Sequence, residues 1–361
     1  YDMLGRETKS ETEAFNSGWI TQVTTYDGKG NVASSTEPYK SGESYITTTY
    51  GYDAYNRQSS INQGALGTTT LAYSYSGGKL TVTSTAPVGT TSKTTDAASM
   101  LTSATDNGGT LNYTYYSHGG LKNVVNGGVT LTINEYDAYA RQKKLIDINA
   151  GTTQYEYNAL GQMTKQINAK GQQTTMAYNV AGQVSQRVSV EDTTTYTYGT
   201  TNVGGEIKGQ IKSVTGFDGT STHYTYNSLG QLTQVKEVNS GDHITSYTYN
   251  NYGDLQTTTY PSGLVITNEY ESKGYLKKIK RGAVELYETT GVNGRGQVTA
   301  YKKGNNKTSI INYTNGFPTK YETAGVQNLN LVWDYQKGNL TSRNDAIKSK
   351  TETFTYDNLN R

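Results

Sequence analysis

A six-residue motif, Tyr-Asp-x-x-Gly-Arg, recurs along the whole chain at a nearly constant spacing. It opens the sequence as Tyr1–Arg6 and closes it as Tyr356–Arg361. A fixed period of about 20 to 50 residues is the sequence signature of a repeat architecture. The array therefore constrains the fold more than any single residue does.

The stronger copies have Tyr at position one, Asp or Asn at position two, Gly at position five and Arg at position six. We place these motif residues at Tyr1, Asp2, Gly5 and Arg6; Tyr26 and Asp27; Tyr52, Asp53 and Arg57; Tyr136, Asp137 and Arg141; Tyr157, Asn158 and Gly161; Tyr178, Asn179 and Gly182; Tyr226, Asn227 and Gly230; Tyr249 and Gly253; Tyr270 and Gly274; and Tyr356, Asp357 and Arg361. Weaker or eroded copies begin near Tyr75, Thr95, Tyr116, Tyr198, Val292, Tyr313 and Tyr335. The intervals average about 22 residues, which fits one supersecondary unit per repeat.

Each repeat has the pattern of a β-hairpin. Tyr and Thr alternate before the motif, as in Tyr224-Thr225-Tyr226, and both are strand-forming residues. Asp or Asn then favours a turn, and a second alternating strand such as Leu232–Lys236 follows. Two strands in each repeat leave no room for a substantial helix, so we predict none.

The glycine at position five is expected to supply a positive φ for the turn. Gly161, Gly182 and Gly230 hold this position in three strong copies. Asn at this position, as at Asn56, tolerates the left-handed region, whereas alanine does so poorly. The turn that contains Ala140 is therefore predicted to differ from the others.

The composition predicts a thin sheet rather than a solid core. Hydrophobic residues make up 33% of the 361 residues, and 33 of the residues are tyrosines. About 32 strands spaced roughly 4.8 Å apart would form a ribbon on the order of 150 Å wide. Open sheets that wide curl or split. The predicted fold is all-β, with hairpins forming a curved, spiralling single-layer sheet around an enclosed or grooved space.

The motif resembles that of the YD-repeat, or Rhs-repeat, family, and the resemblance covers essentially the whole chain. Tyr1–Arg6, Tyr157–Met163 and Tyr226–Leu232 fit the family consensus well. Family members include toxin-complex B/C subunits, Rhs polymorphic toxins and the teneurins. The resemblance implies a hollow β-shell, with residues 1–361 as a single array taken from a longer chain.

The resemblance implies a structural role. The first hypothesis is a section of a shell that encloses a toxin or other polypeptide cargo in a secreted or surface bacterial protein. Its expected partners are a covalently linked C-terminal cargo domain and flanking shell segments. The alternative is a cell-surface adhesion module that binds a glycan or a partner protein through the outside of the shell.

The chain departs from the family pattern in two respects. Some family members cleave off the toxin near an Asp-Pro motif, but none of the four prolines here follows an aspartate. No autoprotease is therefore expected. The motif also drifts, because Gln replaces Arg at residues 162, 183 and 231.

No group of residues suggests catalysis or a cofactor. His118, His223 and His243 are the only histidines, and no metal-binding spacing or nucleophile motif accompanies them. A strand rather than a helix follows Gly291–Gly296, so this stretch is predicted to be a hairpin turn and not a phosphate-binding loop. Asp27–Asn31 lacks the further acids of a calcium loop and is also predicted to be a turn.

The charge and hydropathy patterns exclude two classes of partner. The net charge is +2, and strand alternation would split the basic run Lys277–Arg281 between two faces, so nucleic-acid binding is not expected. No apolar run approaches the length of about 18 residues that a membrane-spanning helix needs. An enzyme is the least favoured of the three functional hypotheses.

Overall fold

The computed structural model describes residues 1–361 and consists almost entirely of β-strands. It contains 33 strands and one three-residue 3-10 helix, η1, at Gly64–Leu66. The strands are β1 Lys9–Glu13, β2 Trp19–Tyr26, β3 Val32–Thr36, β4 Tyr39–Lys40, β5 Thr47–Tyr52, β6 Gln58–Asn62, β7 Thr68–Ser76, β8 Lys79–Ala86, β9 Gly89–Thr95, β10 Leu101–Asp106, β11 Gly109–Tyr115, β12 Leu121–Asn126, β13 Val129–Tyr136, β14 Gln142–Asp147, β15 Gly151–Tyr157, β16 Met163–Ile167, β17 Gln173–Tyr178, β18 Val184–Val188, β19 Thr193–Tyr198, β20 Ile211–Thr215, β21 Ser221–Tyr226, β22 Leu232–Val238, β23 Asp242–Tyr249, β24 Leu255–Thr259, β25 Val265–Tyr270, β26 Leu276–Arg281, β27 Val284–Val292, β28 Val298–Lys303, β29 Thr308–Thr314, β30 Phe317–Thr323, β31 Gln327–Asp334, β32 Asn339–Asp345 and β33 Lys350–Thr353. The all-β prediction is confirmed.

The strands form one sheet in which neighbours along the chain pair antiparallel. In a typical repeat, β15 pairs with β16, and β16 pairs with β17. Near the N-terminus the order is less regular, since β2 pairs with β1, β3 and β4, and β3 pairs with β5. Motif turns follow one strand of each hairpin, so they all lie on one edge of the sheet, here called the motif edge. The remaining turns lie on the opposite edge.

Each motif hairpin contains a β-bulge next to the turn. Glu156 pairs with Lys165, but Tyr157 pairs with Met163, which leaves Thr164 as an extra residue on β16. A bulge interrupts the backbone ladder and can leave a peptide group free for another partner. The same shift occurs beside Tyr26, Tyr52, Tyr136, Tyr178, Tyr198, Tyr226, Tyr249 and Tyr270.

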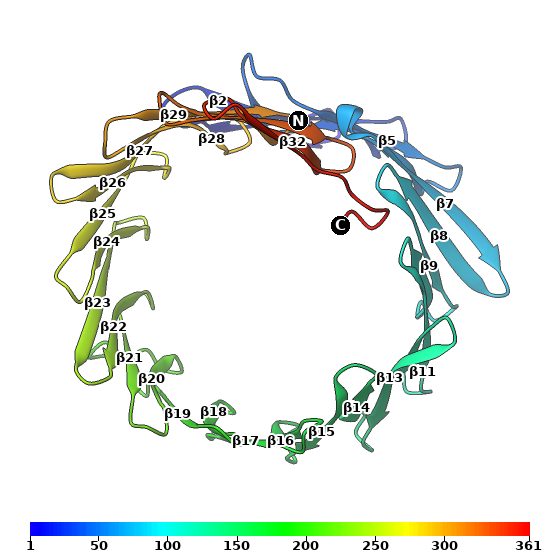
Figure 1. Cartoon of the computed structure of the whole chain (residues 1–361). Coiled ribbons are helices and arrows are strands. Elements are labelled where there is room, and N and C mark those ends of the chain that lie inside the picture. The colour runs from blue at the N-terminus through cyan, green and yellow to red at the C-terminus, as the bar shows by residue number, and fades with distance from the viewer. The chain divides into compact units, whose positions relative to one another are not determined.

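The chain divides into two compact units. Unit 2 is Thr110–Ile266, and unit 1 combines Tyr1–Gly109 with Thr267–Arg361. In unit 2, strands β13 to β23 follow one another as a single layer (Figure 1). Its fully buried side chains are polar, at Asn134 and Ser213. In unit 1, the two chain segments pack against each other, and all four buried apolar residues of the chain belong to this unit.

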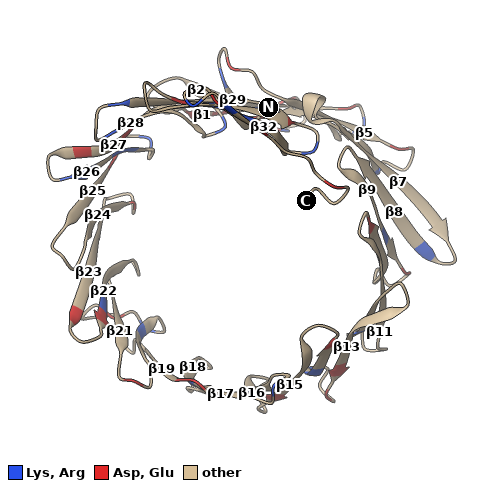
Figure 2. Cartoon of the chain, in the orientation of Figure 1, with Lys and Arg blue, Asp and Glu red and all other residues tan.

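Charged side chains are scattered along both units (Figure 2). Acidic and basic groups alternate along the turns and strands, which agrees with the net charge of +2. No helix in the structure is long and apolar enough to span a membrane.

Candidate functional site: the motif turns and the seam of unit 1

The aspartate at position two organises the motif turn through both of its oxygens. Asp137 Oδ1 accepts hydrogen bonds from the backbone N–H groups of Tyr139 and Arg141, at 2.9 and 3.0 Å. Its Oδ2 accepts a bond from Arg141 Nε at 2.7 Å and lies 2.6 Å from Nη2. The Arg141 side chain is the main cause that lowers the pKa of the Asp137 carboxyl below its ordinary value of 3.8, while partial burial opposes it. Equivalent ion pairs join Asp2 to Arg6, Asp53 to Arg57 and Asp357 to Arg361.

A neutral version of the same turn uses Asn and Gln. Asn158 Oδ1 accepts bonds from the N–H groups of Leu160 and Gln162, and its Nδ2 donates to Gln162 Oε1 at 2.7 Å. The change from Arg to Gln is therefore matched by a change from Asp to Asn in the same turn. Asn179 with Gln183, Asn227 with Gln231 and Asn293 with Gln297 repeat this pairing. The pairing is visible in the sequence, but the motif search treated the Gln residues as drift.

Position five adopts a left-handed backbone. Gly161, Gly182 and Gly230 have φ values of 82°, 81° and 80°, as predicted. The prediction that the Ala140 turn differs is wrong. Ala140 has a φ of 60°, and its N–H donates to the Asp137 carbonyl at 3.1 Å, as glycine does in the other turns. The Asp–Arg pair and the flanking strands hold the turn in shape despite the steric cost at alanine.

Consecutive repeats are joined by the tyrosine at position one. The Tyr157 hydroxyl donates to the carbonyl of Gln142, just after the preceding motif, at 2.7 Å. Burial is the main cause that raises the pKa of Tyr157. The same bond joins Tyr26 to Glu7, Tyr52 to Val32, Tyr73 to Gln58, Tyr136 to Leu121, Tyr178 to Met163, Tyr198 to Val184, Tyr226 to Ile211, Tyr249 to Leu232, Tyr313 to Val298 and Tyr356 to Leu340.

The residue at position six also reaches the next repeat. Arg141 donates from Nη1 to the Asn158 carbonyl at 2.9 Å, and its guanidinium lies 4.9 Å from the centre of the Tyr157 ring. The neutral Gln162 similarly donates to the carbonyl of Gly182 at 3.1 Å. These bonds and the tyrosine bonds couple each motif turn to its neighbour along the motif edge. We refer to them together as the ladder.

One weak motif copy begins one residue earlier than predicted. The N–H of Tyr116 donates to the Gly120 carbonyl, and the N–H of Gly119 donates to the Tyr116 carbonyl. Tyr116 therefore takes position two, and Tyr115 takes position one. Two adjacent tyrosines gave the spacing pattern no means of choosing between them.

Two further copies begin two residues earlier than predicted. Tyr73, rather than the exposed Tyr75, makes the ladder bond, because β7 is extended by a tight turn. In the last part of the chain, Trp333 takes the place predicted for Tyr335. Its indole N–H donates to a backbone carbonyl of β30 at 2.7 Å, so it replaces the phenol as a hydrogen-bond donor.

A second site lies in unit 1, where two motif turns dock on the N-terminal hairpins. We call it the seam and define it as residues 271–275 and 293–297 against residues 13–16 and 37–46. The Tyr270 motif turn binds the turn between β1 and β2. The bonds run from Asn16 N–H to Glu271 Oε2 (3.1 Å), from Lys273 Nζ to the Ala14 carbonyl (3.2 Å) and from the Tyr275 hydroxyl to the Glu13 carbonyl (3.4 Å).

The next motif turn binds the loop that connects β3 to β5. Arg295 forms an ion pair with Glu37. The N–H of Gly294 donates to Glu43 Oε2 at 2.8 Å. A Cβ at Gly294 would lie 2.5 Å from the Cα of Tyr39, so only glycine allows this close approach. Gly291–Gly296 is therefore a strand end and a turn, as predicted, and its function is to pack against the N-terminal segment.

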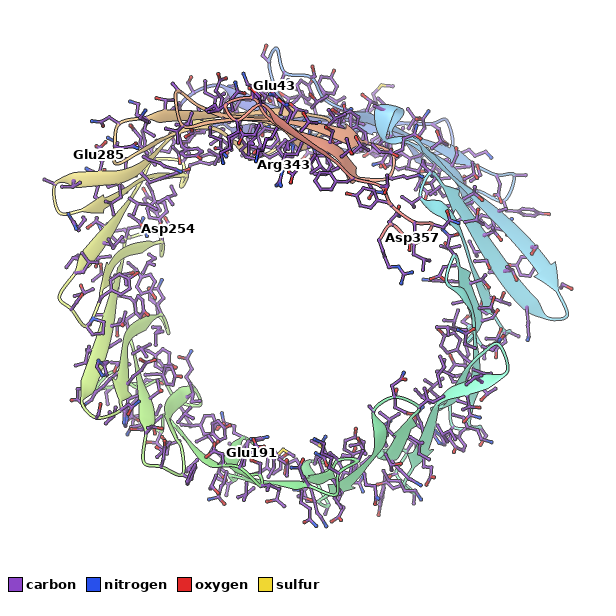
Figure 3. The ribbon with its side chains drawn as sticks, viewed as in Figure 1. Glu43, Glu191, Asp254, Glu285, Arg343 and Asp357 are labelled. Carbon is purple, nitrogen blue, oxygen red and sulfur yellow. The ribbon has the colours of Figure 1, made fainter.

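The seam contains the only apolar core of the chain. Ala14, Phe15, Ile46 and Val292 are buried there, and Phe15 is only 2% exposed. The Tyr275 ring packs edge-on against Phe15 with ring centres 5.8 Å apart. Figure 3 labels Glu43 in this double-layered part of unit 1 and Glu191 on the single layer of unit 2. The motif search missed the seam, because no local pattern links residues about 250 positions apart.

The three histidines lie in separate places. His118 packs between Tyr116 and Tyr136, while His223 contacts the Ser221 hydroxyl in β21. His243 lies in β23 opposite Glu237. The structure contains no group of three or more His, Cys, Asp or Glu residues that could hold a metal ion.

The basic run in β26 is distributed among local partners. Lys278 pairs with Glu285 and Glu288, and Lys280 pairs with Glu269. Lys277 donates to the Asn16 side chain in the seam at 3.0 Å. These contacts account for the charges within the fold.

Comparisons with known proteins relate this architecture to one repeat family. Residues 208–242 match the family model described as RHS Repeat. A structure of the Photorhabdus luminescens Tc holotoxin pore matches 100% of the chain at a TM-score of 0.81 and 15% identity. The crystal structure of TcdB2-TccC3-Cdc42 matches 95% of the chain at a TM-score of 0.78 and 15% identity.

These structural matches share the fold across almost the whole chain. The chain spans about a fifth of the length of the matched chains, with 22% and 21% covered in the two structures. No curated protein sequence matches the chain.

Proposed function

We propose that this chain, which carries an RHS repeat and has the fold of the TcdB2-TccC3 toxin structures, is one section of a β-shell that encloses a toxin or another polypeptide cargo. Residues 1–361 would act as one array within a longer secreted or surface bacterial protein. The shell would act by containment, without chemistry of its own. Its partners would be the linked cargo and the flanking shell segments.

The observation that best supports containment is the absence of a conventional core in unit 2. The strands of unit 2 form a single layer, and none of their apolar side chains is buried. The hydrogen bonds of the ladder instead connect each hairpin to the next. Such a layer separates the solvent on its two faces and leaves both faces available, as a wall requires.

The motif residues would be structural in this role. Nearest-neighbour coupling lets a repeat array extend without a central core. The position-two carboxylate or amide shapes the turn, and the position-one tyrosine joins it to the preceding repeat. The wall would depend on these contacts wherever the motif recurs.

The test is protease protection of the cargo in the complete protein that carries this segment. A flexible reporter peptide replaces the cargo, and its digestion by proteinase K is followed by mass spectrometry. We expect the intact protein to protect the reporter, and the double variant Tyr157→Ala/Tyr178→Ala to expose it, because both ladder bonds are lost. The control Tyr139→Ala/Tyr252→Ala removes two exposed rings and should retain protection.

Digestion of the reporter at the rate of the free peptide in the unmodified protein would contradict containment. In that case adhesion through the surface of the sheet would become the better hypothesis. Binding of the protein to glycans or to cell surfaces would then be the next measurement.

A further inference from the structure

Large apolar side chains project from the motif edge of unit 2. Tyr139, Leu160, Leu229 and Tyr252 occupy position four of their motif turns and are 80–87% exposed, while Val180 occupies position three and is also fully exposed. We call these five residues the stripe. Repeats are two strands apart, so successive members of the stripe are spaced by roughly 10 Å or a multiple of it.

The turn itself does not require an apolar residue at position four. Only the backbone N–H of this residue is used, as in the bond from Leu160 N–H to Asn158 Oδ1. Lys29, Ala98 and Ala181 fill the same position in other turns. A row of exposed apolar residues that local structure does not need indicates an interaction surface.

The seam shows what position four can contact. Lys273 and Arg295 occupy this position in the two motif turns of unit 1 that dock. Lys273 donates to the carbonyls of Ala14 and Asn16, and Arg295 pairs with Glu37. The side chain that projects freely in unit 2 is therefore the one that makes the seam in unit 1.

The partner surface in the seam is the opposite edge of other hairpins. Ala14–Asn16 lies in the turn between β1 and β2, and Glu37–Glu43 lies in the connection from β3 to β5. Both connections are on the edge away from the motif turns. The seam is thus a heterologous contact between a motif edge and an opposite edge.

The opposite edge of unit 2 is also apolar. Its turns expose Ile148, Val190, Phe217 and Tyr260. An apolar motif edge and an apolar opposite edge on the same layer are complementary in the same sense as the two sides of the seam. A further run of the same hairpins can therefore dock on either edge.

From this pairing we propose that the stripe is a docking edge for the opposite edge of another run of RHS hairpins. This deepens the proposed function, on which it rests, by naming the flanking shell surface that the segment contacts. Position four selects the neighbour, since Lys or Arg matches carbonyl- and carboxylate-bearing loops and Leu or Tyr matches apolar loops. A second copy of this chain offers the required opposite edge and serves as the probe.

The first test is self-association of the chain by analytical ultracentrifugation at concentrations up to about 100 μM, a range that detects weak binding. We expect concentration-dependent association that Leu160→Glu/Leu229→Glu weakens by about tenfold or more, because burying a carboxylate in an apolar contact is unfavourable. Val190→Glu/Phe217→Glu should have the same effect from the other edge. A chain that stays monomeric throughout this range would overturn the proposal.

Charge addition away from both edges provides the control. Gln154→Glu/Gln186→Glu places two carboxylates on exposed positions within β15 and β18. These substitutions should leave association unchanged, and circular dichroism should show that all three double variants keep the β-sheet spectrum. Equal weakening by the control would assign the effect to net charge and contradict docking at the edges.

Mixing the two edge variants tests the heterologous geometry. Each variant alone should stay monomeric, but a mixture should form one-to-one dimers, because one partner keeps its motif edge and the other keeps its opposite edge. If mixing does not restore dimers, the contact is not edge to opposite edge, and the proposal fails.

A crosslinking experiment separates this proposal from containment. A benzophenone amino acid replaces Leu229 in the complete protein, and the crosslinked peptide is sequenced. Crosslinks to RHS hairpins support edge docking, whereas crosslinks to the cargo overturn it and leave containment intact. Loss of cargo protection with retained hairpin crosslinks would contradict containment alone.

Discussion

Unit 1 and unit 2 contain the same repeat but are stabilised in different ways. In unit 2, the bonds of the ladder join each turn to the next, and no apolar residue is fully buried. In unit 1, two segments that are distant in sequence also share a small core around Phe15 and Ile46. The repeat therefore supplies local coupling everywhere, whereas the seam adds contacts that depend on specific side chains.

The largest expected effect comes from removing the centre of the seam. Phe15→Ala should destabilise unit 1 by about 3–5 kcal/mol, because a fully buried ring is lost and a cavity remains. Hydrogen exchange should show faster exchange in β1, β2 and β26 to β28. Exchange in β15 to β17 of unit 2 should stay unchanged.

An exposed phenylalanine in unit 2 provides the matched control. Phe217 is largely exposed, so Phe217→Ala should change stability by less than about 0.5 kcal/mol. Equal effects of the two substitutions, or loss of protection in both units after Phe15→Ala, would remove the distinction between a seam and a ladder.

The second effect concerns the ladder of unit 2. Tyr157→Ala removes a partly buried ring and its bond to the Gln142 carbonyl, and should cost on the order of 3 kcal/mol. Denaturant titration measures this loss. The control Tyr252→Ala removes an exposed tyrosine and should be nearly neutral. A loss below about 0.5 kcal/mol at Tyr157 would show that the tyrosine ladder is not a stabilising element.

The third effect tests the backbone of the motif turn. Gly230 has a φ of 80°, so Gly230→Val should cost at least about 1–2 kcal/mol in left-handed backbone strain. Ser228→Val in the same turn should cost less, because Ser228 lies outside the left-handed region. Thermal unfolding of both variants compares them directly. Similar losses would show that the positive φ is not what requires glycine there.

The fourth effect has the opposite sign. Ala140 already adopts a φ of 60°, so Ala140→Gly should relieve strain and stabilise the turn by up to about 1 kcal/mol. Ala181→Gly is the control, since Ala181 precedes the position-five glycine of its turn and is absent from the positive-φ residues. Destabilisation by Ala140→Gly, measured by thermal unfolding, would mean that the Asp137–Arg141 pair does not hold a strained backbone.

The sequence predicted what is local and periodic. The alternation of Thr and Tyr gave the strands, and the glycine at position five gave the positive φ at residues such as Gly161. It failed at Ala140, because tertiary and side-chain bonds outweighed the intrinsic preference of alanine. It also failed at Trp333, because a tryptophan N–H can replace a tyrosine hydroxyl as a donor.

The seam could not be predicted from the sequence. Phe15 and Val292 look like other strand or turn residues, and no repeat position distinguishes them. Their burial depends on two segments of unit 1 meeting after the chain has passed through unit 2. The stripe is different, because the apolar residues at position four are visible in the sequence. Only their exposure, beside the docked Lys273 and Arg295, suggests a role for them.

The smallest effect distinguishes the two versions of the motif turn by pH. The Arg141 side chain is the main cause that holds the pKa of Asp137 below 3.8. A carboxyl whose pKa is lower in the folded state stabilises the fold above its unfolded pKa, and this contribution is lost as the pH falls through the folded pKa. Asp137→Asn/Arg141→Gln copies the neutral pair Asn158–Gln162 and should reduce the loss of stability on acidification below about pH 4.

The reverse exchange sharpens this test. Asn158→Asp/Gln162→Arg places the charged pair in the neighbouring turn and should increase the loss of stability over the same acid range. Urea titrations at neutral pH and at several values below about pH 4 measure both variants against the unmodified chain. The effect is expected to be the smallest of the five, because partly exposed ion pairs are screened by solvent. If both variants lose stability with acid just as the unmodified chain does, the two turn types are equivalent and the pairing of Asp with Arg reflects geometry rather than charge.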